Sequence, residues 1–374
     1  MVCHDATGTY KKGTARGGLP GDSIGLAAIA RKVGRPSVRT CGSCHMESGG
    51  AAYARHGDLE PALAANPADL DVHMGALKMR CQECHTTTDH HISGMSMSAS
   101  AAEGRFGCEK CHSTTPHGVA GVLSRHLDDH IRAVACQTCH IPSIARTLPI
   151  LVRRDYSTAG ENRAASADRF GLPQYDKRFG DLTWGKDIVP SYLWYDGTRN
   201  ASFAGDKIDP SKTVVLNAPV GEKRTPAARI FPFQLQSAIQ PYDSANKVLA
   251  MPKLLDDYWT GFDWSRAIAD GMKQAGQPFS GKFGFVETRL YSPVNHEVVL
   301  ARQALGCADC HSPEAVTCTR CHSKAEPLDL PEHRRAVYPQ VKNRIDFKAL
   351  GYPGDPAVVG GRFYINLGRG KPPQ

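Results

Sequence analysis

The sequence predicts a mainly α-helical fold with much irregular structure and little sheet. Aromatic residues make up only 7% of the 374 residues and hydrophobic residues 41%, a thin supply for a core of this size. Gly and Pro are frequent, at 36 and 25 residues, which disfavours long uninterrupted elements. One cysteine-containing pentapeptide also occurs six times. We therefore expect short helices packed around apolar groups that the polypeptide does not itself supply.

The repeated pentapeptide is C-x-x-C-H. Two thiols three residues apart can bond the two vinyl groups of one haem, and the His that follows reaches the iron. The copies are CGSCH (41–45), CQECH (81–85), CEKCH (108–112), CQTCH (136–140), CADCH (307–311) and CTRCH (318–322). Their residues are Cys41, Cys44, His45, Cys81, Cys84, His85, Cys108, Cys111, His112, Cys136, Cys139, His140, Cys307, Cys310, His311, Cys318, Cys321 and His322. Six copies predict a multihaem cytochrome c fold built around closely packed haems, with haem c as the cofactor.

The first residues, MVCH, carry the second Cys and the His of one more motif, Cys3 and His4. We expect the sequence to begin inside this motif, which would be a seventh site, with further motifs and a secretory signal upstream. The alternative is that Cys3 and His4 are adjacent by accident. Covalent haem attachment takes place outside the bacterial cytoplasm, so the expectation of a lost signal goes with a periplasmic location.

Zinc sites and disulfides are the competing interpretations of paired cysteines. Zinc ribbons place two C-x-x-C pairs around one ion, but nothing in zinc geometry requires His directly after every second Cys. Thirteen cysteines is an odd number, and closely spaced pairs close only short loops. The constant position of His therefore favours haem.

Nine of the 16 His residues do not follow a motif Cys, and six-coordinate haem needs a second axial ligand from elsewhere. The nine are His56, His73, His90, His91, His117, His126, His130, His296 and His333. Adjacent His90 and His91 cannot easily face one haem together, so we prefer one of them, His90. Met is the rival ligand, and we interpret Met74, Met79, Met95 and Met97 as packing residues.

The motifs divide the chain into three regions. Residues 1–145 are haem-dense, 146–300 contain no Cys and are expected to form a covering subdomain, and 301–374 carry the last two motifs. The short spacing between motifs in the first region forces neighbouring haems close together.

Start and stop signals predict three helices. One spans 23–33, capped by Asp22 or Ser23 and followed by Gly34. A second follows the capping residue Asp263 and is closed by Gly276. A third includes 123–134 and runs into CQTCH, with His126 and His130 one turn apart.

Charge and hydropathy limit the partners. The formal net charge is +8, but each haem adds two propionates, so many Arg and Lys are expected to pair with propionates rather than with nucleic acid. No apolar run approaches the ~18 residues that a membrane span needs.

Beyond its motifs, the sequence resembles the octahaem tetrathionate reductase family of c-type cytochromes. The resemblance covers nearly the whole chain, including segments without haem motifs. It rests on VCHDATGTYKK (2–12), HGDL (56–59), LDVHM (70–74), CQECHTTTDHHISG (81–94), CEKCHSTTPH (108–117), RHLDDHIRAVACQTCHIP (125–142), DYSTAG (155–160), GDKIDPSK (205–212), QPYDSANK (240–247), PVNHEVV (293–299) and ALGYPGDP (349–356).

The resemblance implies a periplasmic protein related to pentahaem nitrite reductase and hydroxylamine oxidoreductase. Most haems would have two His ligands, and one would have a Lys amine at the substrate position, for which Lys11 or Lys12 is the candidate. The distal ligands or their neighbours would be His56, His73, His90, His117, His126, His130 and His296. The segment around CTRCH departs from the family pattern as an insertion that adds a haem, with His333 as its partner.

Two functions of different classes follow. The first is an oxidoreductase that reduces tetrathionate, nitrite or hydroxylamine with electrons passed along stacked haems, although the substrate haem lies upstream in the family. The second is a pure electron-transfer protein with two His on every haem. Both functions require an electron-donor protein or a quinol-linked cytochrome as partner. The oxidoreductase also requires a small inorganic oxyanion as substrate.

Overall fold

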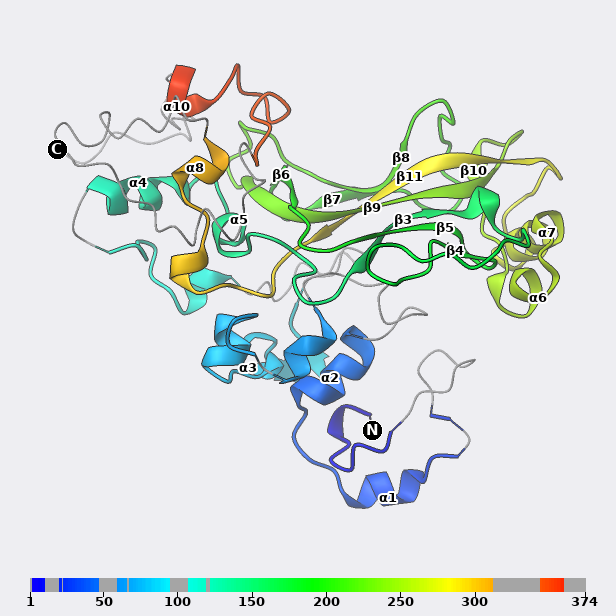
Figure 1. Cartoon of the computed structure of the whole chain (residues 1–374), viewed down its shortest axis with the longest axis horizontal. Coiled ribbons are helices and arrows are strands. Elements are labelled where there is room, and N and C mark those ends of the chain that lie inside the picture. Colours follow the sequence, from blue (N-terminus) through cyan, green and yellow to red (C-terminus); the bar gives the residue numbers. More distant parts are fainter. Residues whose placement is uncertain are drawn as a thin grey trace.

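The computed structural model describes residues 2–10, 20–21, 23–46, 59–65, 67–94, 107–118, 122–311 and 344–359. Short helices and turns occupy one side of the molecule, and a large sheet extends away from them (Figure 1). A pair of helices, α6 and α7, caps the far end of the sheet. No helix in the described ranges is long and apolar enough to cross a membrane.

Short helices carry the haem motifs and their neighbours. They are η1 (Val2–His4), α1 (Leu26–Arg31), α2 (Val38–His45), η2 (Pro61–Ala65), η3 (Val72–Ala76), α3 (Cys81–Cys84), η4 (Cys108–Lys110), α4 (Val122–His130), α5 (Cys136–His140), η7 (Ala301–Gln303), α8 (Cys307–Cys310) and α10 (Pro356–Val359). The helices of the sheet region are η5 (Tyr156–Thr158), η6 (Leu254–Tyr258), α6 (Trp259–Gly261) and α7 (Trp264–Gln274).

The sheet has nine strands. They are β3 (Ile150–Asp155), β4 (Tyr175–Asp176), β5 (Gly180–Gly185), β6 (Ser191–Tyr195), β7 (Arg199–Ala201), β8 (Val214–Pro219), β9 (Arg229–Asp243), β10 (Val248–Leu249) and β11 (Phe283–Pro293). The order is β4-β5-β3-β9-β11-β8-β7, with β6 and β10 also paired to β9. The sheet is mixed, because β3 runs parallel to β9 and β11 parallel to β8, while the other pairs are antiparallel. A separate hairpin joins β1 (Thr87–Thr88) and β2 (His91–Ile92).

The prediction of a mainly α fold with little sheet is wrong, since the structure has 27% helix and 24% strand. The physical reason is an uneven distribution of large side chains. All four Trp residues lie between positions 184 and 264, inside the Cys-free region. A low aromatic average over the whole chain concealed a region rich enough in aromatic and β-branched residues to build a sheet core without haem.

The three predicted helices fare differently. Helix α7 is confirmed, because the Asp263 carboxylate caps it by accepting from the Arg266 amide at 3.1 Å, and Ile268 and Met272 are fully buried. Helix α1 is shorter than predicted and begins after Gly25 without a side-chain cap. The helix expected to run into CQTCH instead ends at His130, and α5 begins separately at Cys136.

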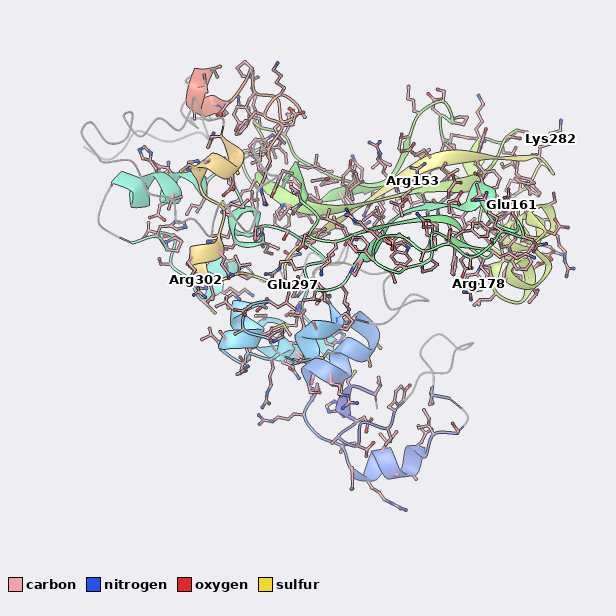
Figure 2. The ribbon with its side chains drawn as sticks, viewed as in Figure 1. Arg153, Glu161, Arg178, Lys282, Glu297 and Arg302 are labelled. Atoms are coloured by element: carbon pink, nitrogen blue, oxygen red, sulfur yellow. The ribbon has the colours of Figure 1, made fainter. Side chains whose placement is uncertain are left out.

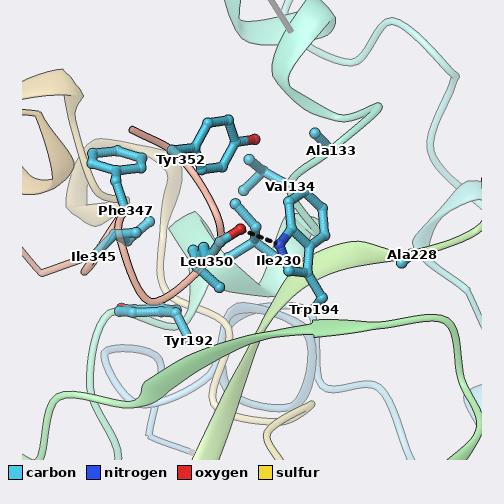
Figure 3. Packing of buried hydrophobic residues seen from close by; sticks show 10 residues of the cluster. All are labelled: Ala133, Val134, Tyr192, Trp194, Ala228, Ile230, Ile345, Phe347, Leu350 and Tyr352. Carbon is cyan, nitrogen blue, oxygen red and sulfur yellow. Dashed lines mark hydrogen bonds between the residues drawn. The ribbon is translucent and has the colours of Figure 1, made fainter. Parts of the chain in front are cut away.

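The sheet is tied directly to the CQTCH segment. At the start of β9, Ile230 donates to the Ala133 carbonyl at 2.7 Å, and its own carbonyl accepts from the Ala135 amide and the Thr138 hydroxyl. The surrounding cluster includes Trp194, whose indole donates to the Leu350 carbonyl at 3.0 Å (Figure 3). The longest strand therefore holds a haem motif and a C-terminal segment together.

The carboxylate of Asp243, at the end of β9, contributes to the stability of the sheet. Its fully buried carboxylate accepts hydrogen bonds from Asn246 and Ser280. Burial alone raises the pKa of Asp243, but these hydrogen bonds outweigh it and lower the pKa to about 2. The stabilisation is therefore complete above the ordinary value of 3.8 and is lost as the pH falls towards 2. We expect Asp243→Asn to lower the free energy of unfolding at pH 7 by about 2 kcal/mol.

Circular dichroism during thermal unfolding of the haem-loaded protein measures this effect. Asp209→Asn is the control, because that exposed carboxylate accepts comparable bonds from Ser211 in a loop. Equal losses in the two variants would show that burial of Asp243 contributes nothing.

Candidate haem-binding sites

Each described C-x-x-C-H motif is folded as a single helical turn. The amide of the motif His donates to the carbonyl of the first Cys in CQECH, CEKCH and CADCH, at 2.7, 2.9 and 2.9 Å. In CQTCH the whole motif forms α5, and CGSCH forms the C-terminal turn of α2. Residues three and four apart lie on one face of a turn, so the two sulfurs and the imidazole of each motif are directed to one side.

The structure brings five motif His residues opposite five others. Their ring centroids are 6.0 to 6.4 Å apart. The pairs are His4 with His90 (6.2 Å), His112 with His73 (6.0 Å), His85 with His296 (6.1 Å), His140 with His117 (6.4 Å) and His311 with His130 (6.2 Å). Every pair joins one His that follows a Cys to one His that does not.

These separations fit two imidazoles on opposite sides of one iron. Metal–nitrogen bonds of about 2.0 Å and about 1.2 Å from each nitrogen to its ring centre add to ~6.4 Å. A close-packed protein would ordinarily fill such a gap, and imidazole is a suitable ligand for iron. The residues present therefore fit a haem held between each pair of rings, with thioether bonds from the same motif.

Hydrogen bonds fix the orientation of five of these rings. Nδ1 donates to a backbone carbonyl in three cases: His4 to Gly34 (2.9 Å), His85 to Ser93 (2.8 Å) and His130 to His126 (2.6 Å). It donates to a carboxylate in two: His117 to Asp128 (2.7 Å) and His311 to Asp355 (2.8 Å). A proton on Nδ1 leaves the lone pair on Nε2, which is the nitrogen that can bind a metal.

Burial favours the neutral form of two of these imidazoles. Loss of solvent lowers the pKa of both His130 and His140, and the nearby His311 and His117 respectively add to the effect. A neutral imidazole is the form that binds a metal ion.

The turn of the β1–β2 hairpin places His90, and not His91, opposite His4. Asp89 and His90 both have positive φ, at 48° and 65°, which is the arrangement of a two-residue type I′ turn. His90 at the tip reaches His4, whereas His91 pairs with Thr88 in the strand.

A buried carboxylate positions two of the non-motif His residues. Asp71 caps η3 by accepting from the Met74 amide at 2.7 Å, and η3 carries His73. Its other oxygen accepts from the Val298 amide at 3.1 Å, in the segment that carries His296. Asp71 is only 3% exposed, so it fixes both segments from inside the protein.

Glu297 anchors the His296 segment to the sheet region. Its carboxylate is fully buried 3.6 Å from the Arg146 guanidinium, which also donates to the Glu297 carbonyl at 2.8 Å. Figure 2 shows Glu297 between the sheet and the N-terminal helices. The residue has φ +65°, an uncommon conformation for a side chain of this size, so the contacts on both sides must stabilise it.

The cysteines place consecutive motifs next to one another. The Cys41 thiol hydrogen-bonds that of Cys81, and this contact raises the pKa of Cys41; Cys108 and Cys136 are related in the same way. Burial raises the pKa of Cys139 to about 12, and the neighbouring Cys307 adds to the effect. Burial raises the pKa of Cys84, and the neighbouring Cys111 adds to the effect, so the motifs follow the order 41–45, 81–85, 108–112, 136–140 and 307–311. None of the eleven cysteines in the described residues forms a disulfide.

Unpaired cations gather near the N-terminal motifs. Five exposed basic side chains form no ion pair within the part of the chain that the structure describes. They are Arg31, Lys32, Arg35, Arg39 and Arg80. Beside the sheet, by contrast, Arg163 in the loop before β4 pairs with Glu161 and Asp181. The free cations suit the haem propionates that the charge balance calls for.

Several predicted residues lie outside the described residues: His56, His322, His333, Cys318, Cys321, Lys11 and Lys12. His126 is described but faces no motif His within the described ranges; its carbonyl instead orients His130. The structure also adds Asp71, Asp128 and Asp355, which sequence reasoning missed. The sequence offered a signal for two of them. Asp71 lies two residues before His73 in LDVHM, and Asp128 lies between His126 and His130 in RHLDDH.

Known proteins share both the fold and the sequence. A family model described as bacterial cytochrome c matches residues 152–314. The chain is also similar to the octahaem cytochrome c from Shewanella oneidensis, at 37% identity and a TM-score of 0.80, over 95% of this chain and 75% of that one. This chain belongs to the multihaem c-type cytochromes. The cytochrome thus binds haem c covalently, and bacterial relatives of this kind are commonly periplasmic. No curated protein matches it.

The two adjacent His residues of the hairpin give a matched test of the ring pairs. We expect His90→Ala to convert one haem of the cytochrome from low spin to high spin, because His4 loses the imidazole opposite it. His91→Ala should leave all haems unchanged. Electron paramagnetic resonance (EPR) of the ferric protein measures the change. A high-spin signal from His91→Ala alone would contradict the assignment.

Proposed function

We propose that the cytochrome transfers electrons along a row of haems, each held between two imidazoles. The single observation that carries this proposal is the set of five ring pairs, each with one motif His and the spacing of trans axial ligands. Contacts between the cysteines of consecutive motifs support a continuous row. Closely placed haems with both axial positions filled exchange electrons and do not bind substrate.

The proposed ligation extends beyond the described pairs. We assign His4, His85, His112, His140 and His311 as proximal ligands, opposite His90, His296, His73, His117 and His130. CGSCH and CTRCH would bring the number of haems to seven, with His56 and His333 as the distal candidates.

The ring planes predict two kinds of ferric signal. Planes are nearly parallel in His85–His296 (27°) and His117–His140 (13°), and nearly perpendicular, at 69° to 74°, in the other three pairs. Parallel imidazoles donate into one iron d orbital and split the orbital pair, whereas perpendicular ones raise both orbitals equally. We therefore expect rhombic low-spin EPR signals together with highly anisotropic signals of large gmax. A spectrum with one kind alone would contradict the ring geometry.

Reduction of tetrathionate, nitrite or hydroxylamine is the second candidate function. It is favoured by the sequence resemblance described above and by similarity to an octahaem cytochrome over 95% of the chain. The substrate position would need an additional haem or a displaceable ligand, for which Lys11 or Lys12 remains the candidate. A periplasmic location, a donor protein or quinol-linked cytochrome, and a small oxyanion belong to this proposal.

Reoxidation of the reduced holoprotein distinguishes the two functions. The full-length protein is reduced anaerobically and mixed with each of the three compounds, and haem absorbance is followed. Turnover that is lost in a Lys11→Ala, Lys12→Ala double variant would support the reductase. No reoxidation by any compound, with low-spin ferric signals throughout, would support electron transfer alone. High-spin signals from most haems would overturn the proposed ligation.

A further inference from the structure

Two neighbouring ring pairs have a carboxylate behind one imidazole. Asp128 accepts from His117 Nδ1 at 2.7 Å, and the two side chains are 13% and 25% exposed. Asp355 accepts from His311 Nδ1 at 2.8 Å, and both side chains are 12% exposed. The carbonyl acceptors of His4, His85 and His130 carry no formal charge.

Both carboxylates are held by more than their contact to His. Asp128 lies on α4, and its Oδ1 also accepts from the His117 amide at 3.3 Å. Asp355 precedes α10 and caps it, since its Oδ1 accepts from the Ala357 amide at 2.9 Å. Phe347 stacks on the His311 ring at 5.3 Å, which restricts rotation of the imidazole. The two hydrogen bonds are therefore built into the local fold.

A carboxylate that accepts from Nδ1–H draws the proton towards itself and increases the electron density on Nε2. A more basic Nε2 favours ferric over ferrous iron, and so does a negative charge in a partly buried position. We propose that Asp128 and Asp355 are positioning residues that lower the reduction potentials of the haems held by residues 136–140 and 307–311. This inference rests on the ligation given under Proposed function.

The position of these two haems gives the row a direction. Cys139 lies close to both Cys307 and Cys310, so the two motifs are neighbours at one end of the described series. Electrons run spontaneously from low to high potential. The donor partner therefore delivers electrons at the 136–140 and 307–311 end, and they pass towards residues 41–45.

The unmodified protein provides the first test. One of the two haems has nearly parallel rings (His117–His140, 13°) and the other nearly perpendicular rings (His130–His311, 74°). In a potentiometric titration of the full-length holoprotein followed by EPR, the last two ferric signals to disappear should be one rhombic and one of large gmax. Two final signals of the same kind would overturn the inference.

Variants supply the second test. Asp128→Asn and Asp355→Asn should each raise one low potential, by a roughly tenfold change in the ferric-to-ferrous equilibrium, which is about 59 mV for one electron. Asp129→Asn is the matched control, because Asp129 lies on the same helix, is 62% exposed and pairs with Arg132. It removes the same charge from a carboxylate that acts on His130 through space alone, so it separates the effect of charge from that of the hydrogen bond to Nδ1.

The outcomes separate this inference from the ligation. The inference would be overturned if the haems stay low spin and the potentials move no more in Asp128→Asn and Asp355→Asn than in Asp129→Asn. Asp128→Glu should restore a potential close to that of the unmodified protein, which a purely structural role would not require. If one variant fails to mature with haem, the other variant and the titration of the unmodified protein decide. High-spin signals in the unmodified protein would overturn the ligation itself.

Discussion

The structure depends on one constraint: an imidazole on a C-x-x-C-H turn must meet a second imidazole across a gap of about 6 Å. The first imidazole is placed by local helix geometry. The second comes from a hairpin tip, a capped π-helical turn, a loop or the last residue of helix α4, and each of these needs its own anchor. Asp71 serves two of them at once, by capping η3 and by binding the Val298 amide. A small change at Asp71 would therefore affect two of the proposed haem sites.

The sheet provides the fixed reference for these anchors. Ile230 in β9 binds the chain on both sides of CQTCH, and Arg146 connects Glu297 to the backbone carbonyls of Asp69 and Leu70. Burial of the Arg146–Glu297 pair costs desolvation energy, which the added backbone hydrogen bonds help to offset. A region without haem motifs thus determines where several of the proposed axial ligands lie.

The sequence was sufficient for the parts of the site that are local. Cys and His at fixed spacing specify one helical turn, so the position of each described C-x-x-C-H turn could be predicted residue by residue, and the role of these residues as haem ligands stays a prediction. The distal His candidates could be proposed as a set. They could not be assigned to individual motifs, because pairs such as His85 and His296 are determined by tertiary structure. The position of His90 opposite His4 depends on a turn with positive φ at both central residues, Asp89 and His90. An Asp-His dipeptide does not predict such a turn. The sheet was missed because average composition hides the clustering of Trp.

The pairing of His85 with His296 has a consequence for the biogenesis of the protein. More than 200 residues separate the two rings. Under the proposed ligation, a haem attached at Cys81 and Cys84 acquires its second imidazole only after most of the polypeptide has been delivered to the maturation machinery. His112 and His73, in contrast, are both present early. Haems along one chain would then complete their coordination at different times, and the nascent protein would pass through species with an open iron position.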